Sequence, residues 1–139
     1  MIAKAQRFPY SVVDESLGMA SSLPYLPMTL TYQDASLVVS GLLDTGATVN
    51  VLPFGIGRQL GAIWAHQTVP VRLTGNLARL EARALVVTAT VEPFRPVRLA
   101  FAWTRADSIP LILGQVNSYL EFDVCFFRSQ QAFEIKPKE

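Results

Sequence analysis

The stretch that decides the fold runs Gly41-Leu42-Leu43-Asp44-Thr45-Gly46-Ala47-Thr48-Val49-Asn50-Val51-Leu52-Pro53. An apolar strand leads directly into a carboxylate, a glycine then allows a tight backbone turn, and alternating apolar residues resume after it. A carboxylate at the end of an apolar strand costs free energy unless other groups satisfy it. The tripeptide Asp44-Thr45-Gly46 alone also suits an ordinary strand-ending turn. Other features of the sequence are therefore needed to distinguish a structural turn from a catalytic site.

The rest of the chain predicts mainly β-structure. Pro53 can open a short helical turn. Val116, Tyr119 and Leu120 share a face, which predicts a short helix within residues 115–122. Many short strands with one short helix near the C-terminus indicate an all-β fold, a closed barrel or a sandwich. The strands are expected at residues 28–32, 36–40, 48–52, 69–74, 78–91, 97–104, 109–114, 124–127 and 132–135.

Length and composition suit one globular domain. The chain has 139 residues, of which 50% are hydrophobic and 17% are charged, so it can bury a core and is not a disordered segment. Residues 1–27, interrupted by prolines, are expected to form a partly irregular N-terminal arm. Residues 28–139 are expected to form the domain.

The charges exclude several classes of function. Twelve basic against eleven acidic residues leave a formal net charge of +1, and they are scattered along the chain. This pattern gives no electrostatic basis for binding nucleic acid or an anionic membrane. We find no signal peptide and no run near the ~20 apolar residues of a membrane helix, so a cytoplasmic location is expected.

The single cysteine and the single histidine predict no chemistry of their own. Cys125 lies in an apolar stretch and is expected to be a buried small side chain. His66 has no cysteine or histidine near it in the sequence, so we expect a structural histidine. No metal site is predicted.

A second motif changes the interpretation of the first. Ile112-Leu113-Gly114 follows a proline and precedes the expected helix. Together with Asp44-Thr45-Gly46-Ala47, it resembles the single-domain retropepsin-like aspartic peptidases of retroviral and bacterial type. In that family two hydrophobic residues and a glycine, followed by a short helix, pack behind the catalytic loop. The resemblance extends in element order over residues 28–135 and implies an acid-protease fold with one lobe per chain.

The chemistry of this family requires two carboxyl groups. One acts as general base toward water and the other protonates the carbonyl oxygen, and the two share one proton when held ~3 Å apart. The remaining aspartates, Asp14, Asp34, Asp107 and Asp123, lie in no second Asp-Thr-Gly or Asp-Ser-Gly. The two-lobed, single-chain form is therefore excluded. The resemblance implies a homodimer with Asp44 as catalytic residue, a polypeptide substrate and no cofactor.

The neighbours of Asp44 take roles from the same resemblance. Thr45 would hydrogen-bond across the dimer axis, Gly46 would let the backbone approach the carboxylate and substrate closely, and Thr48 completes the active-site loop. Ala47 lacks the hydroxyl with which a serine could favour the ionised carboxylate. A weakly acidic optimum is therefore expected.

Two further segments allow two interpretations each. Residues 69–85 could be the flap hairpin that closes the cleft, with its tip at Gly75 and Asn76, or an ordinary surface hairpin. This tip has one glycine, whereas the retroviral pattern is glycine-rich. The apolar terminal strands near residues 124–127 and 133–135 could interleave with a second copy, or pair within their own chain.

Two functions follow from the sequence. The first is an aspartic endopeptidase that binds an extended polypeptide between two subunits. The alternative is a non-catalytic dimerisation or peptide-binding module on the same fold. The intact Asp44-Thr45-Gly46-Ala47 favours the enzyme, and the plain flap tip leaves room for the module.

Overall fold

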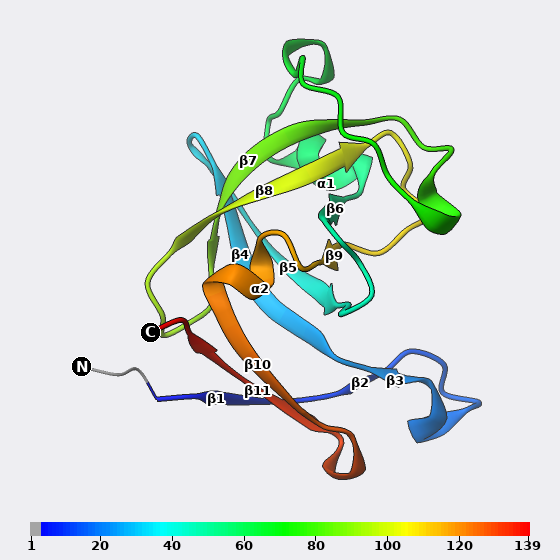
Figure 1. The fold of residues 1–139 in the computed structure, drawn as a ribbon, viewed down its shortest axis with the longest axis vertical. Coiled ribbons are helices and arrows are strands. Elements are labelled where there is room, and N and C mark those ends of the chain that lie inside the picture. Colours follow the sequence, from blue (N-terminus) through cyan, green and yellow to red (C-terminus); the bar gives the residue numbers. More distant parts are fainter. Residues whose placement is uncertain (1–3) are drawn as a thin grey trace.

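A closed barrel of six strands forms the body of the molecule, in the order β4-β5-β9-β6-β8-β7 (Figure 1). The structure is a computed structural model, and it describes residues 4–139. β5 with β9 and β6 with β8 run parallel, whereas the other neighbouring strands are antiparallel. The all-β prediction is confirmed. The strands are β4 (Tyr25–Tyr32), β5 (Ala35–Leu43), β6 (Asn50–Leu52), β7 (Ala82–Thr90), β8 (Val97–Thr104) and β9 (Ile112–Leu113).

The barrel core follows from the two-residue alternation of its strands. In β4, Leu26, Met28 and Leu30 are buried at every second position, and Leu85 and Val87 do the same in β7. Successive side chains of a strand point to opposite faces. In β4 and β7, one face therefore fills the barrel, whereas the short strands β6 and β9 are buried along their whole length.

Helix α1 (Phe54–Gln59) follows Pro53, as the sequence predicts. Gly57 lies inside this helix, where a Cβ would come within 2.3 Å of the Trp103 ring. Trp103 is fully buried and donates from Nε1 to the Phe54 carbonyl at 3.1 Å. The absence of a side chain at Gly57 thus allows the helix to close one end of the barrel over a tryptophan.

Helix α2 (Ser118–Glu121) lies in the expected region but is shorter than predicted. The prediction that Val116, Tyr119 and Leu120 share a packed helical face was wrong. Val116 and Leu120 are exposed, while Tyr119 packs against the core. Within residues 4–139 the other helical elements are four 3-10 helices: η1 (Gly18–Ser21), η2 (Trp64–His66), η3 (Gly75–Leu77) and η4 (Arg128–Gln130).

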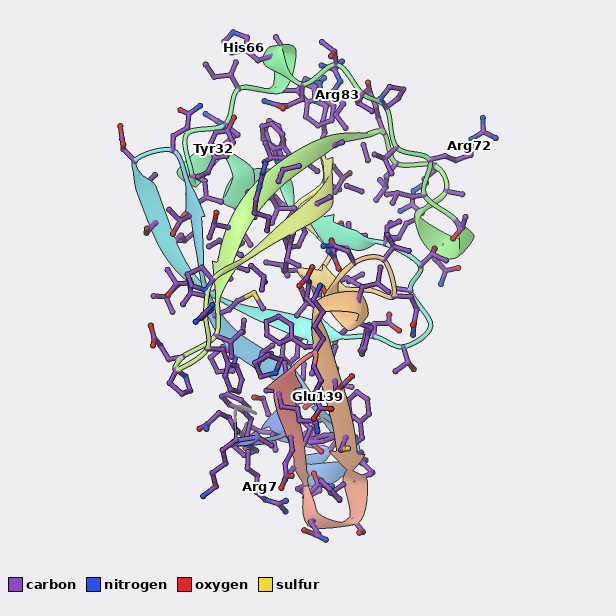
Figure 2. The ribbon with its side chains drawn as sticks, turned by 60° about the vertical axis from the view of Figure 1, so that its left-hand side comes forward. Arg7, Tyr32, His66, Arg72, Arg83 and Glu139 are labelled. Atoms are coloured by element: carbon purple, nitrogen blue, oxygen red, sulfur yellow. The ribbon has the colours of Figure 1, made fainter. Side chains whose placement is uncertain are left out.

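The two ends of the chain form a second, smaller sheet. β1 (Gln6–Pro9), β11 (Ala132–Pro137) and β10 (Phe122–Phe127) lie in that order, all antiparallel. Beside it, β2 (Ser11–Val12) pairs with β3 (Ser22–Leu23). Figure 1 shows both pieces projecting from the barrel. Figure 2 places Arg7 at this end of the molecule, and His66 and Arg83 at the opposite end.

The N-terminal region contains more regular structure than its prolines suggested. Residues 6–27 hold three short strands, and the expected boundary after Pro27 falls inside β4, where Pro27 pairs with Ser40. The division into an arm and a domain stays a prediction. The terminal strands pair within their own chain, which the second of the two interpretations expected.

Two other expectations were wrong. Cys125 is exposed rather than buried, because β10 turns Phe122 inward and Cys125 to the outer face. Residues 69–74 form no regular strand, and β7 starts at Ala82; the two segments meet through a single bridge between Pro70 and Arg83. Among residues 4–139, no helix combines the length and the apolar character that crossing a membrane requires.

Candidate active site

Asp44 stands where β5 leaves the barrel. Its backbone amide donates to the Leu113 carbonyl at 3.0 Å, and its own carbonyl accepts from the Ala47 amide at 3.1 Å. Its side-chain Oδ1 accepts from the Gly46 amide at 2.9 Å. The side chain is half-buried. The loop therefore holds the carboxylate in one orientation while leaving it open on one side.

The residues that follow Asp44 face outward. Thr45, Gly46 and Thr48 are exposed, and Ala47 is half-buried. A Cβ at Gly46 would lie 3.4 Å from the nearer carboxylate oxygen, which is ordinary contact. Nothing within the single chain thus requires glycine at this position. The open side of the loop has room for another molecule.

The Ile112-Leu113-Gly114 motif supports the loop from behind. Ile112 and Leu113 are buried and pair with Leu42 and Leu43 of β5. A Cβ at Gly114 would lie 2.5 Å from the Val49 carbonyl oxygen. The glycine is therefore needed for this close approach, and the structure brings the two sequence motifs into direct contact.

The two residues after Gly114 extend this contact to the loop that carries Asp44. The Gln115 amide donates to the Ala47 carbonyl at 2.9 Å, and the Val116 amide donates to the Thr48 carbonyl at 2.7 Å. The Gln115 side chain donates from Nε2 to the Thr45 carbonyl at 3.0 Å. Three carbonyl groups of the loop are thus held by two consecutive residues.

Asn50 is a part of the site that sequence reasoning missed. It is fully buried, and its Oδ1 accepts from the Gly114 amide at 2.8 Å and from the Ser118 hydroxyl at 2.6 Å. Its Nδ2 donates to the Ala100 carbonyl at 3.0 Å and to Asn117 Oδ1 at 3.2 Å. A buried amide with all its hydrogen bonds made is a rigid connection. Here it joins β6, β8, Gly114 and the start of α2.

Asn117 extends the same network along β8. Its Oδ1 also accepts from the Ala100 amide at 3.1 Å, and its Nδ2 donates to the Arg98 carbonyl at 3.1 Å. The available signal was a polar residue, Asn50, within the apolar run 49–52. A polar residue expected in a core needs partners, and Asn117 and Ser118 supply them.

Tyr119 is a second unpredicted neighbour of the site. Its hydroxyl is buried and has no hydrogen-bond partner within residues 4–139. Burial, together with the negative charge of Asp44, raises the pKa of Tyr119 to about 12. Both causes disfavour the phenolate. The ring therefore stays uncharged near Asp44 at any ordinary pH.

The candidate flap segment lies over the strand that follows the loop. The Val71 amide donates to the Ala82 carbonyl at 3.0 Å, and the Ala84 amide donates to the Val69 carbonyl at 2.8 Å. Between these contacts the chain forms η3, in which Gly75 has a positive φ of 62° and is exposed, as is Asn76.

The inner side of this segment is apolar. Leu73 is buried in a small cluster with Val51 and Ile112, and Leu77 packs against the same cluster. Arg72 points away into solvent in Figure 2. The segment is therefore an amphipathic cover that touches residues of both motifs through its leucines.

His66 lies exposed on η2, far from these residues. The described part of the chain brings no three histidine, cysteine, aspartate or glutamate side chains close enough together to hold a metal ion. The chemical groups present at the site are thus a carboxylate, backbone amides and hydroxyl groups.

Comparison with known proteins supports the fold. No protein-family model matches the chain, and no curated protein matches it in sequence. Among solved structures, it is similar to a retropepsin-like aspartic protease from Rickettsia conorii, with a TM-score of 0.63 and 13% identity over 96% of this chain and 93% of that one. The chain therefore has the retropepsin-like acid-protease fold, as a single lobe.

A second solved structure overlaps more loosely. The EIAV protease in complex with the inhibitor HBY-793 is 22% identical, with a TM-score of 0.48 over 67% of this chain and 82% of that one. The assignment of the fold rests on the first similarity and on the barrel topology.

Proposed function

We propose that the chain is one subunit of a homodimeric aspartic endopeptidase, with Asp44 as its catalytic carboxylate. The observation that carries this proposal is the geometry of the loop. The Asp44 side chain is oriented by the Gly46 amide, and Gln115 holds the loop at the Thr45 carbonyl. The loop is open where Thr45 and Gly46 are exposed. An ordinary strand-ending turn also lets an aspartate accept from the amide two residues on. The support for a catalytic role is that this loop is backed by Ile112, Leu113 and Gly114 and is open on its other side.

The reaction needs both copies of Asp44. In the dimer the two carboxyl groups hold one proton between them, because like charges ~3 Å apart do not both ionise. The ionised carboxylate takes a proton from water, and the oxygen of that water attacks the carbonyl carbon of the peptide. The protonated carboxyl group gives its proton to the carbonyl oxygen. The carboxyl group that took the proton from water then gives it to the amide nitrogen, and the other carboxylate takes back the proton from the former carbonyl oxygen. The carbonyl re-forms and the carbon–nitrogen bond breaks.

The neighbouring residues support this chemistry without taking part in it. Thr45 would hydrogen-bond across the two-fold axis, and Gly46 would leave space for the second loop and the substrate. The absence of a hydroxyl at Ala47 agrees with a weakly acidic optimum. Residues 69–81, with Gly75 and Asn76 at the outer end, would cover an extended polypeptide and bind its backbone as an added strand would.

The direct test is Asp44→Asn, with Asp34→Asn as the matched control on the exposed turn between β4 and β5. Both changes remove one negative charge. We expect the parent and Asp34→Asn to cleave a mixed peptide library between acid and neutral pH. Asp44→Asn should lose at least ~10³-fold in rate, because it removes the general base and the shared proton.

The outcome that contradicts the proposal is equally clear. If the parent cleaves no peptide at any pH, or if Asp44→Asn cleaves as well as Asp34→Asn, the chain is not an aspartic peptidase. Peptide binding by a dimer without cleavage would support the non-catalytic module on the same fold.

A further inference from the structure

The segment between β2 and β3 carries an unusual concentration of exposed apolar side chains. We call residues 11–23, which contain β2, η1 and β3, the ribbon. In most soluble proteins, exposed apolar side chains are scattered singly, and a contiguous group marks an interaction surface. Its exposed members are Val12 at 42%, Val13 at 59%, Leu17 at 60%, Met19 at 67% and Leu23 at 37%.

The ribbon is nevertheless held by an ordered set of hydrogen bonds. The Asp14 amide donates to Ser21 Oγ at 3.0 Å, and Asp14 Oδ1 accepts from the Ser16 amide at 3.0 Å. Arg128, from η4, donates to the Ser22 carbonyl at 2.8 Å. It also donates to the Met19 carbonyl at 3.2 Å. Hydrogen bonds thus order the ribbon while its apolar side chains are exposed to water.

The ribbon differs from the barrel in which of its side chains are buried. Ser22 is buried, whereas its neighbours Met19 and Leu23 are exposed. Exposed apolar area costs roughly 25 cal/mol per Å² relative to burial. Covering these side chains with another surface would therefore be favourable.

The position of the ribbon indicates what that surface is. The Leu43 amide donates to the Pro24 carbonyl at 3.1 Å, and Tyr25 pairs with Leu42. Leu23 and Asp44 are the next residues along the chain beyond this hydrogen bond, at the same end of the β4–β5 pair. The ribbon therefore joins the barrel at the end from which the Asp44 loop leaves.

We propose that a second copy of this chain covers the ribbon in the catalytic dimer. The proposal rests on the proposed function, because the reaction requires two Asp44 carboxyl groups ~3 Å apart. Any surface beside Asp44 on the same edge is then brought against the other copy. A two-fold interface uses the same surface on both subunits, and a formal net charge of +1 gives little repulsion between them.

Peptide cleavage should therefore depend on the contact that the ribbon makes in the dimer. Without the ribbon contact, the two loops separate and each carries one carboxyl group. Loss of apolar side chains from the ribbon should therefore weaken dimerisation first. Activity should fall only because fewer dimers are present.

The test compares Met19→Asp with Val38→Asp by sedimentation equilibrium and by peptide cleavage over a dilution series. Both place a carboxylate on a strongly exposed apolar position, but Val38, 77% exposed on β5, lies on the barrel. Met19→Asp should raise the dimer dissociation constant at least ~10-fold, the effect of a moderate interface residue. Its activity should return at high protein concentration, and Val38→Asp should behave as the parent.

Four results separate this proposal from the proposed function. A dimeric, active parent with a weakened Met19→Asp dimer supports both. Equal dissociation constants for parent and Met19→Asp overturn the ribbon contact and leave the peptidase intact. A dimer that depends on Met19 but cleaves nothing supports the ribbon contact and overturns the peptidase. A parent that stays monomeric at all concentrations overturns both.

Discussion

The barrel and the terminal part of the molecule differ in how far their apolar side chains are buried. The terminal part consists of the β1-β11-β10 sheet and the ribbon. In the barrel, Leu30, Leu52 and Trp103 are fully buried by strands of the same chain. In the terminal part, Phe133 is buried between strands, but Phe126 and Met19 remain exposed. A closed sheet satisfies its own edges, whereas a short open sheet and ribbon do not. The comparison teaches that the barrel buries its core with its own strands, whereas the terminal part leaves more of its apolar side chains exposed.

The largest expected effect compares a glycine of the barrel with one of the ribbon. Gly114→Ala would place a Cβ 2.5 Å from the Val49 carbonyl oxygen, and the backbone on both sides is fixed. We expect a loss of about 3 kcal/mol or more in the free energy of unfolding. Gly18→Ala meets open space, but Gly18 has a φ of +55°, so a loss of about 1 kcal/mol is expected.

Urea unfolding of both variants and the parent, followed by tryptophan fluorescence, measures this difference. Trp64 and Trp103 both lie in the barrel half of the molecule. Equal losses for the two variants would show that the ribbon is packed as tightly as the barrel.

A second comparison uses buried polar groups. Asn50→Ala removes four hydrogen bonds and leaves the Gly114 amide without its side-chain acceptor. Each unpaired buried group costs about 1–3 kcal/mol, so we expect a loss of about 3 kcal/mol. Ser22→Ala, in the ribbon, should lose about 1 kcal/mol because Arg128 keeps its bond to the Ser22 carbonyl.

Thermal unfolding at pH 7 measures both losses, and cleavage at saturating protein concentration adds a second readout. Asn50→Ala should reduce cleavage per dimer, because Asn50 holds Gly114 behind the catalytic loop. A variant with normal cleavage per dimer would confine Asn50 to a stabilising role.

The smallest effect concerns Tyr119. The pKa of Tyr119 is raised from 10 to about 12 in the folded chain. The unfolded chain therefore releases this proton first, so its effect on the free energy of unfolding is constant below pH 10, and stability falls as the pH rises from 10 through 12. Two pKa units correspond to roughly 3 kcal/mol for a sealed group, and partial exposure reduces this to roughly 1–2 kcal/mol. Tyr119→Phe should remove this alkaline loss and, at pH 7, gain about 1 kcal/mol, since it deletes an unpaired buried hydroxyl.

Melting curves between pH 8 and pH 12, taken as differences from the parent, isolate the Tyr119 contribution from other groups that titrate there. Tyr32→Phe, on β4, is the matched control. If both variants lose stability with pH as the parent does, Tyr119 is not the source of the alkaline transition.

Much of the fold could be predicted from particular residues. Alternation placed β4, β5, β7 and β8 near their observed positions, and Pro53 placed α1. These signals are local, because the side-chain period and the fixed φ of proline act over a few residues. The identity of the candidate loop came from the same kind of signal, an apolar strand followed by Asp44-Thr45-Gly46-Ala47.

The errors concern residues whose surroundings are distant in sequence. Cys125 was expected to be buried because its neighbours are apolar, yet only the pairing of β10 with β11 shows which face is outward. Residues 69–74 were expected to form a strand, but they form an irregular segment in which Leu73 is buried and Val69 is exposed. Val116 and Leu120 share a helical face only in a helix longer than α2.

The sequence by itself determined where the carboxylate stands, that it ends an apolar strand, and that no second copy of its motif exists in the chain. Those properties depend on residue order alone. Only the tertiary structure decided that Asn50 joins Gly114 to Ser118, that Gly57 faces Trp103, and that the ribbon turns its apolar side chains outward. Each of these rests on contacts between residues far apart in the chain, and burial is a property of the packed surfaces rather than of the residue.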